Sequence, residues 1–248
     1  MYYHLVEKRS SFKELKIFTK LNHILFEKIS PNIADGVFVI SDLLEKYVRE
    51  RNKKIKILKV LPIFDYSVVE EARKIKESSI SETYSFIENK FILYCGSFAY
   101  KEVIDLIINS YNKSIINKSI KLVMVLTSFK ENDMEYQNFI NSNTNIVFLS
   151  KLNYIDLVRL YINSFALVIP MRDTIQDKAR MPNKISEYTG TKSIIITNIV
   201  GELGKYFNDS NAILAESFHI NSYVKAFNKL NYLTNIINII MIKVILLY

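Results

Sequence analysis

The sequence has few of the residues from which disulfides and metal sites are built. It contains one cysteine, Cys95, and three widely spaced histidines, His4, His23 and His219. A single cysteine excludes a disulfide within the chain and favours a reducing compartment. Its position in the apolar run 91–95 favours a buried strand residue over a reactive thiol. The histidines are too scattered to indicate a metal cluster.

The familiar phosphate-binding loops are also missing. No stretch matches the Gly-x-Gly-x-x-Gly loop of dinucleotide-binding domains or the Gly-x4-Gly-Lys-Ser/Thr loop of P-loop proteins. There is no Asp-x-Asp motif, so the sequence does not support phosphate binding through a metal ion held by such a motif. The most apolar run, 236–248, is interrupted by Lys243. With 13 residues it is too short to span a bilayer. We expect it to be a core helix, a surface-docking helix or an artefactual tail.

The composition is that of a folded chain with a positive surface. Hydrophobic residues make up 49% of 248 residues, enough for a sizeable core. The net charge of +8 arises from 33 basic and 25 acidic side chains and favours anionic partners such as nucleotides, phosphorylated lipids or an acidic membrane face. The basic residues are spread along the chain without an aromatic and basic cluster, so we expect no nucleic-acid partner.

The N-terminal part of the chain predicts a short α/β segment, residues 1–66. The hydrophobic pattern predicts a helix over 12–29, a strand over 37–40, a helix over 43–49 and a strand over 55–61. Residues 67–89 are charged and rich in Ser and Glu, with only a weak helical pattern. They are the expected connection between two domains.

From residue 90 the pattern becomes regular and predicts one domain over 90–248. Strands are expected at 91–95, 120–126, 146–149, 166–169, 194–197 and 212–214, and helices at 101–113, 131–141, 154–163, from 182, at 202–207 and at 219–230. Continuous apolar strands that alternate with amphipathic helices are typical of a parallel sheet covered on both faces. The expected fold class is therefore α/β with a doubly wound parallel sheet.

The stretch 166–197 is the most informative of these units. It predicts a strand, a loop with five charged residues at 172, 173, 177, 178 and 180, a helix that begins at Pro182, and a second strand. In an open parallel sheet, ligands bind beyond the carboxyl ends of the strands, where this loop lies. Proline suits the first helical position, and the free amides of a helix start favour an anion.

Several residues of these loops could hold a ligand, and each has a plainer alternative. In the functional interpretation, Gly96 permits a sharp turn or a close backbone approach, and Lys101 binds an anion; in the structural one, they form an ordinary tight turn with a solvated lysine. For Glu187 the functional interpretation is that it accepts hydrogen bonds from sugar hydroxyls, and the structural one is that the helix dipole favours a glutamate there. For Arg180 and Lys184 the two interpretations are neutralisation of a diphosphate and simple solvation.

Beyond these patterns, the sequence resembles the group 1 (family 4) retaining glycosyltransferases over roughly residues 34–230. The resemblance rests on Ala-Asp-Gly-Val-Phe-Val-Ile-Ser at 34–41, Ile-Leu-Tyr-Cys-Gly-Ser at 92–97 with Lys101, Val-Ile-Pro at 168–170, and above all Pro-Asn-Lys-Ile-Ser-Glu-Tyr at 182–188, which leads into Ile-Ile-Ile-Thr at 194–197; Gly201-Glu202 and Asn211-Ala212 also match. It implies a GT-B architecture, with two doubly wound domains and a nucleotide-diphosphate sugar held by the C-terminal, Rossmann-like one.

The resemblance also implies roles for individual residues. Gly96 and Ser97 would approach the donor phosphates, Lys101 would neutralise them, and the helix start at Pro182, Asn183 and Lys184 would face them. Glu187 matches the second glutamate of the family's Glu-x7-Glu pattern and would bind the ribose hydroxyls. The first glutamate would fall at Ala179 and is missing, Ser97 stands where an arginine is common, and Glu102 follows Lys101 in place of a glycine. These departures leave the binding of the nucleotide better supported than the positioning of the sugar, and no catalytic residue can be assigned.

The function implied by the resemblance is transfer of a sugar, with retention, from a nucleotide-diphosphate sugar to a glycan or lipid-linked acceptor in polysaccharide biosynthesis. No metal or other cofactor is expected. The expected location is cytoplasmic, with peripheral contact at the inner membrane face. Residues 1–66 resemble only the end of an N-terminal acceptor-side domain, so we expect a truncated enzyme or a fragment. The alternatives are a nucleotide-sugar epimerase of the same architecture and a non-catalytic module that binds a nucleotide-sugar or a partner.

Overall fold

The computed structural model describes residues 1–12, 15–75, 90–128, 134–191 and 193–245, which form two compact units. Unit 1 contains Met1–Phe64, Met171–Ser186 and Ile199–Phe207. Unit 2 contains Asp65–Pro170, Glu187–Asn198 and Asn208–Tyr248. The first part of the expected connection forms helix α3 (Ser67–Lys74), and its second part, 76–89, lies outside the described residues.

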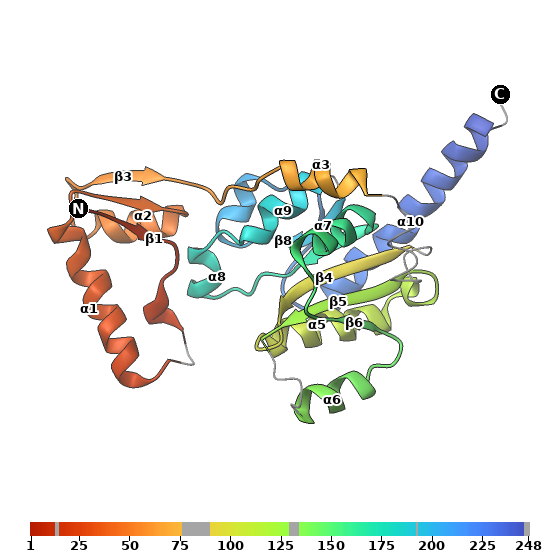
Figure 1. The fold of residues 1–248 in the computed structure, drawn as a ribbon, viewed down its shortest axis with the longest axis horizontal. Helices are drawn as coiled ribbons and strands as arrows, with labels where there is room; N and C mark the ends of the chain where they lie inside the picture. The colour runs from red at the N-terminus through yellow and green to blue at the C-terminus, as the bar shows by residue number, and fades with distance from the viewer. Residues whose placement is uncertain (13–14, 76–89, 129–133, 192, 246–248) are drawn as a thin grey trace. The chain divides into compact units, whose positions relative to one another are not determined.

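Unit 2 is built on a six-stranded parallel sheet (Figure 1). Its strands are β4 (Phe91–Ser97), β5 (Lys121–Thr127), β6 (Val147–Leu149), β7 (Ala166–Ile169), β8 (Ile194–Asn198) and β9 (Ile213–Ala215), in the spatial order β6-β5-β4-β7-β8-β9. The chain moves outward from β4 to β6, then returns to the other side of β4 and continues outward to β9. This is the doubly wound order in which the direction reverses between two central strands, here β4 and β7. The expected fold class is confirmed.

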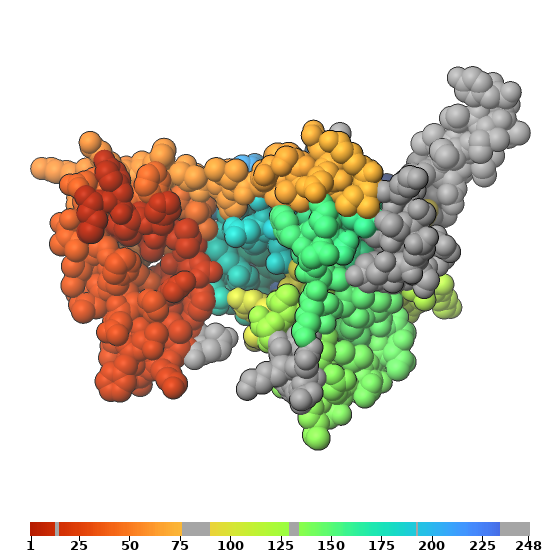
Figure 2. Space-filling view, in the orientation of Figure 1, coloured from red at the N-terminus to blue at the C-terminus, as the bar shows by residue number. Residues whose placement is uncertain are grey.

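Both faces of this sheet are covered, which explains the continuous apolar strands. On one face Ile92 and Met124 pack into a core with α5 (Lys101–Lys113) and α10 (Ile220–Ile245). On the other, Tyr161 of α7 (Tyr154–Asn163) approaches Cys95 of β4. Figure 2 shows α3 lying against α7 on the outside of this layer. Every residue from 91 to 95 is at most 5% exposed, so Cys95 is the buried strand residue that its surroundings indicated.

Unit 1 has a smaller parallel sheet of three strands, in the order β1-β2-β3. These are β1 (Tyr2–Leu5), β2 (Gly36–Val39) and β3 (Lys56–Lys59). Helix α2 (Asp42–Arg49) follows β2 and buries Leu44 and Val48, which lie four residues apart on one helical face. The strand β1 was not predicted, because four residues at the start of the chain, most of them partly exposed, give no alternation to recognise.

Other elements differ from the sequence-based expectations in type or extent. Helix α1 (Ile17–Ile33) runs past the expected end at 29 and includes Pro31 in its last turn. The charged loop contains a short helix, α8 (Ile175–Ala179), and a 3-10 turn, η4 (Gly201–Lys205), replaces the helix expected at 202–207. Two further 3-10 turns are η1 (Arg9–Ser11) and η3 (Ile115–Lys118). Helix α6 (Met134–Asn141) begins where the described residues resume, so the expected start at 131 lies outside them.

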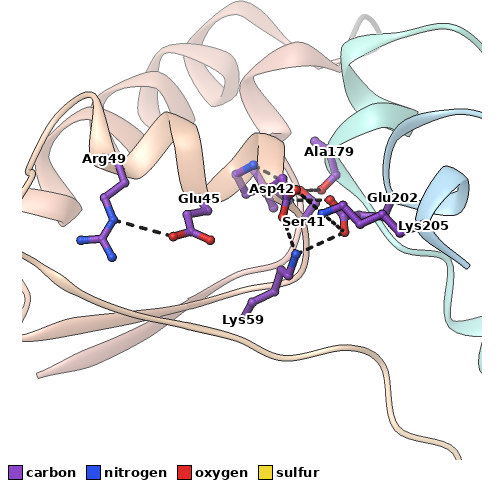
Figure 3. A network of polar contacts seen from close by, with 9 residues as sticks. Ser41, Asp42, Glu45, Arg49, Lys59, Ala179, Glu202 and Lys205 are labelled. Atoms are coloured by element: carbon purple, nitrogen blue, oxygen red, sulfur yellow. Dashed lines mark hydrogen bonds and ion pairs between the residues drawn. The ribbon is translucent and has the colours of Figure 1, made fainter.

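A polar network joins η4 to the start of α2 within unit 1 (Figure 3). The Glu202 side chain is 3% exposed and accepts a hydrogen bond of 2.6 Å from the backbone N–H of Asp42. The ammonium groups of Lys59 and Lys205 lie 3.5 and 3.3 Å from the same carboxylate, and both also pair with Asp42. Hydrogen bonds from Lys205 and Lys59 lower the pKa of the Asp42 carboxyl. Two carboxylates and two lysines therefore lie within pairing distance of one another, and the buried Glu202 carboxylate has two cationic partners.

Two close contacts bring α8, from another segment of unit 1, beside α2 and η4. The Ser41 hydroxyl donates a hydrogen bond of 2.7 Å to the carbonyl of Ala179, the last residue of α8, while it caps α2 by accepting from the N–H of Leu44. Gly201 has a φ of +57°, and a Cβ there would lie 2.6 Å from the carbonyl oxygen of Lys178. Glycine is therefore required where η4 passes α8.

No helix among the described residues has the length and apolar character needed to cross a membrane. Helix α10 continues beyond the expected end at 230 to Ile245, so the apolar run that begins at 236 extends an existing helix.

We expect Ile92→Ala to lower the free energy of unfolding by about 2–5 kcal/mol, because Ile92 is fully buried in the central strand and the change leaves a cavity. Ile115→Ala is the matched control, since the Ile115 side chain is 52% exposed and its loss should cost less than about 0.5 kcal/mol. Urea unfolding followed by circular dichroism measures both. Equal losses for the two variants would contradict the described burial of β4.

We expect Glu202→Gln to destabilise unit 1 by about 1–3 kcal/mol, because the amide keeps an acceptor for the N–H of Asp42 but leaves two lysines with a single carboxylate. Glu216→Gln is the control: Glu216 pairs with Lys225 at 3.0 Å, but both side chains are exposed, so its loss should change stability by less than about 1 kcal/mol. If urea midpoints fall equally for both variants, the network does not hold η4.

Candidate functional site

The carboxyl end of β4 places two of the predicted site residues, Gly96 and Ser97, at the sheet edge. Gly96 lies under the side chain of Tyr94, whose hydroxyl would be 2.1 Å from a Cβ at this position. The Ser97 hydroxyl accepts a hydrogen bond of 3.2 Å from the N–H of Ala99. The N–H of Phe98 donates to the carbonyl of Thr127, at the end of β5, at 2.8 Å. The turn is thus fixed to the neighbouring strand, and glycine is needed because Tyr94 occupies the space of a side chain.

Lys101 is the first residue of α5, directly after this turn. Its ammonium donates a hydrogen bond of 2.8 Å to Glu135 of α6 and lies 3.3 Å from the ring centroid of Phe98. The ring of Phe98 is itself held edge-on by Tyr136 and Phe139. The side chains of Lys101 and Glu135 are 38% and 71% exposed, and ion pairs of this kind contribute about 0–1 kcal/mol. The Lys101 charge is therefore paired in this structure, but weakly enough for another anion to compete for it.

Glu187 lies in the helix that precedes β8, α9 (Asn183–Thr191), and its carboxylate faces the phenol of Tyr154 at the start of α7. Partial burial raises the pKa of Tyr154, and the negative charge and hydrogen bonding of Glu187 raise it further. The neighbouring Tyr188 is fully buried, with its ring 5.0 Å from that of Tyr161 in an edge-to-face arrangement. Burial raises the pKa of Tyr161 and that of Tyr188 well above the usual value, so these two phenols stay neutral. Glu187 thus sits beside a hydroxyl group, on a helix anchored by Tyr188.

Arg180, another of the predicted site residues, belongs to a buried charge cluster in unit 1. The Asp177 carboxylate is 1% exposed and lies 2.9 Å from the Arg180 guanidinium. It also accepts hydrogen bonds from the Arg172 backbone N–H at 2.8 Å and from Arg172 Nε at 3.0 Å. Thr174 caps α8 by accepting from the N–H of Asp177. The charged loop is therefore folded around Asp177, and the Arg180 charge is already paired.

The start of α9 contains the remaining predicted residues. The helix begins at Asn183, one residue later than expected, and the Pro182 carbonyl accepts a hydrogen bond of 2.9 Å from the N–H of Ile185. Asn183 is exposed and Lys184 is half-buried. Ser186 donates from its hydroxyl to the Asn183 carbonyl at 2.7 Å. The backbone of this helix start is thus ordered by local bonds.

The predicted residues fall into two groups. Unit 2 contains Gly96, Ser97, Lys101 and Glu187, and unit 1 contains Arg180, Pro182, Asn183 and Lys184. In unit 2 the first three share one strand end and helix start, at the point where the strand order reverses. Open α/β sheets bind ligands at such a point.

Ala179 occupies the position at which the resembling family would have its first glutamate. It is fully buried in the core of unit 1, together with Leu5, Val39 and Leu44. A glutamate among these apolar side chains would bury a charge at high cost. The substitution therefore fits the packing of this chain.

Around α8 and η4, the sequence interpretation missed two features. Helix α8 has a recognisable start, since Thr174 and Asp177 have the spacing of a helix N-cap and an acidic third residue. The pairing of Glu202 with Asp42 had no local signal, because 160 residues separate the two. Among the residues that the structure describes, no group of histidine, cysteine and acidic side chains could hold a metal ion.

No protein-family model and no curated protein matches this sequence. Solved structures do match the fold. Anabaena HepE, solved with UDP-glucose, has a TM-score of 0.72 and 14% identity, over 94% of this chain and 63% of its own. A Thermosynechococcus elongatus sucrose-phosphate synthase has a TM-score of 0.69 and 13% identity, over 93% and 58%. A UDP-forming α,α-trehalose-phosphate synthase from Burkholderia xenovorans has a TM-score of 0.67 and 12% identity, over 92% and 59%.

The chain spans about three fifths of the length of these structures. At identities of 12–14%, the likeness concerns the fold. The parallel sheets of this chain and their helices have the Rossmann-like GT-B fold.

Proposed function

We propose that this chain binds a nucleotide-diphosphate sugar through unit 2 and takes part in glycosyl transfer. The observation that carries the proposal is the turn after β4, where Gly96, Ser97 and Lys101 meet at the reversal of the strand order. The fold likeness supports it, because one similar structure contains UDP-glucose and another is named as UDP-forming. The reaction we propose is transfer with retention to a glycan or lipid-linked acceptor, in polysaccharide or glycolipid assembly.

The proposed contribution of Lys101 is electrostatic. A diphosphate gains negative charge as it leaves the sugar, and a preorganised cation with helix amides stabilises that charge without a metal. Lys101 stands at the first position of α5, where the amides of the helix start also point. Its ion pair with Glu135 is exposed, so a dianionic diphosphate can displace the carboxylate.

Glu187 would bind the ribose of the donor. Its carboxylate already interacts with the hydroxyl of Tyr154, which is the chemistry that a ribose hydroxyl requires. We propose that the ribose takes the place of this phenol or shares the carboxylate with it. The resemblance adds Pro182, Asn183 and Lys184 to the donor site and the charge of the loop adds Arg180, and these assignments remain predictions.

A second candidate function is a binding module that does not turn over its ligand. The observation that favours it is the apolar core position of Ala179, where the resembling family has a glutamate for sugar positioning. Radiolabelled sugar transfer and donor hydrolysis distinguish the two functions. Binding of the donor without either reaction would favour the module.

We expect UDP to bind the wild type and Lys101→Ala to weaken that binding by about 10- to 150-fold, since a charge-assisted hydrogen bond contributes about 1.5–3 kcal/mol. Uridine, which lacks phosphates, should bind both proteins equally. Isothermal titration calorimetry measures the affinities, with ADP and GDP as a test of base preference. The control is Lys113→Ala, which removes an exposed lysine from the other end of α5.

We expect Glu187→Ala to remove the discrimination between UDP and 2′-deoxy-UDP. The wild type should prefer UDP by roughly tenfold, because a hydrogen bond to a charged group is lost with the 2′-hydroxyl. The control is Glu216→Ala, whose carboxylate pairs with Lys225 on the surface. Calorimetry that finds equal preference in the wild type and in Glu187→Ala would remove Glu187 from the ribose site.

A further inference from the structure

The exposed side of helix α1 carries an unbroken row of aliphatic residues. Every fourth residue, from the first of the helix to the last, is isoleucine or leucine: Ile17, Leu21, Leu25, Ile29 and Ile33. Each of them is between 43% and 72% exposed. Residues four apart form a continuous ridge on the surface of a helix, and such ridges pack into the grooves of a second helix. These five residues, the α1 ridge, therefore form a helix-packing surface that the described part of the chain leaves open.

Specific contacts turn the α1 ridge outward. Glu27, Ser30 and Pro31 are the buried residues of the helix. The Glu27 carboxylate accepts hydrogen bonds from the backbone N–H of Ser10 at 2.9 Å and from its hydroxyl at 2.5 Å, so this side of the helix is held against η1. Glu27 follows Leu25 by two residues, which is a rotation of about 200° around an α-helix. Leu25 therefore lies on the side opposite to the one that is fixed to unit 1.

Three more apolar side chains widen the α1 ridge. Ile24 is 42% exposed, Phe26 is 53% exposed and Phe18 is 80% exposed. The ring of Phe26 meets that of Tyr3 in β1 edge-on, with 6.0 Å between the centroids, so the apolar surface continues toward the sheet. Together with the ridge, these residues expose on the order of 800 Å², which is what one partner contributes to an interface of standard size. Monomeric proteins rarely expose so large an apolar patch, which indicates an interaction surface.

The α1 ridge offers little to a charged partner. Of the lysine and glutamate residues of α1, Glu27 is buried, Lys20 is half-buried and only Lys28 is exposed. A lysine beside an apolar surface lays its aliphatic stem along it and keeps the ammonium in water. Recognition must therefore depend on apolar area and shape. The surface that matches the ridge best is another apolar helix of similar length.

A second copy of the chain presents such a helix. Twofold symmetry brings the same patch of two copies together, and the residue at the axis contacts its own copy. Leu25 is the middle residue of the α1 ridge, with Ile17 and Leu21 on one side and Ile29 and Ile33 on the other. Reversal of the helix direction therefore leaves an aliphatic residue at every position of the ridge. An axis at Leu25 places aliphatic residues of one copy against those of the other.

We propose that the α1 ridge is the interface between two copies of this chain, related by a twofold axis at Leu25. Burial of apolar area drives such an association. The net charge of +8 opposes it, but salt screens this repulsion beyond about 8 Å at physiological ionic strength. Dimerisation should therefore be at least as strong at high salt as at low salt. The proposal does not rest on the proposed function.

The test measures the mass of the purified full chain by sedimentation equilibrium over a dilution series. We expect the wild type to reach twice the mass of one chain as its concentration rises. Leu25→Glu should raise the dissociation constant of the dimer by about 100-fold or more, because it brings two carboxylates together in an apolar contact. Ile63→Glu is the matched control and should dimerise as the wild type does, since Ile63 is an aliphatic residue of unit 1 that is 90% exposed and lies outside α1.

A cysteine at the axis tests the symmetry. Leu25→Cys should form a disulfide between two copies under mild oxidation, because residues at a twofold axis approach within the roughly 7 Å between Cα atoms that a disulfide allows. The wild type should not cross-link, since its only cysteine, Cys95, is buried. Ile63→Cys controls for random collisions and should cross-link far less. Circular dichroism checks that each variant is folded, as expected for exposed positions.

Three results would overturn the proposal. The first is a folded wild type that stays monomeric at every concentration; if that monomer binds phosphatidylglycerol vesicles and Leu25→Glu does not, the α1 ridge belongs to a lipid surface. The second is a dimer that Leu25→Glu weakens no more than Ile63→Glu does, which would place the interface elsewhere. The third is equal cross-linking of Leu25→Cys and Ile63→Cys. None of these results bears on whether UDP binds to unit 2.

Discussion

Burial of β4 on both faces is the constraint on which unit 2 depends. Its residues 91–95 are covered by α5 and α10 on one side and by α7 on the other, and each is at most 5% exposed. The first partly exposed residues of the strand are Gly96 and Ser97, at its carboxyl end and just before the turn to α5. A ligand that needs hydrogen bonds can therefore approach this strand only at its carboxyl end. The position of the candidate site follows from how the sheet is packed.

In unit 1, by contrast, most of the conspicuous charges already have partners. Arg172 and Arg180 surround the buried carboxylate of Asp177, and Lys59 and Lys205 surround Glu202 and Asp42. Removing one member of a buried cluster leaves an uncompensated charge, which is costly. Arg172, Lys59 and Lys205 are therefore better suited to holding the segments of unit 1 together than to binding and releasing a substrate, while Arg180 stays a predicted donor residue whose charge is paired with Asp177. The candidate donor residues of unit 2 differ, because the ion pair of Lys101 is exposed and exchangeable.

The sequence predicted most of the fold because the signals were local. Each strand of unit 2 is an apolar run of a few residues, and each helix between them buries residues at helical spacing, so both could be recognised without knowing their neighbours. Contacts across the chain were not predictable in this way. Ser41 donates to Ala179 across 138 positions, and no pattern around either residue indicates the other. The same limit applies to α1, whose apolar period predicted a helix but not that its polar face would turn inward to Ser10.

The sequence predicted where the candidate site lies, but not that Lys101 would be paired with another side chain there. Spacing alone put Lys101 at the start of a helix beside Gly96, and the structure agrees. Spacing could not reveal Glu135, which approaches from α6 and pairs with the lysine. If Lys101 binds a diphosphate, the anion must first break this pair, and its exposed geometry keeps the cost at about 0–1 kcal/mol. A dianion offers more charge than one carboxylate and gains the amides of the helix start as well. Under the proposed function the balance therefore favours the diphosphate, whereas in this structure the pair with Glu135 holds the Lys101 ammonium over Phe98.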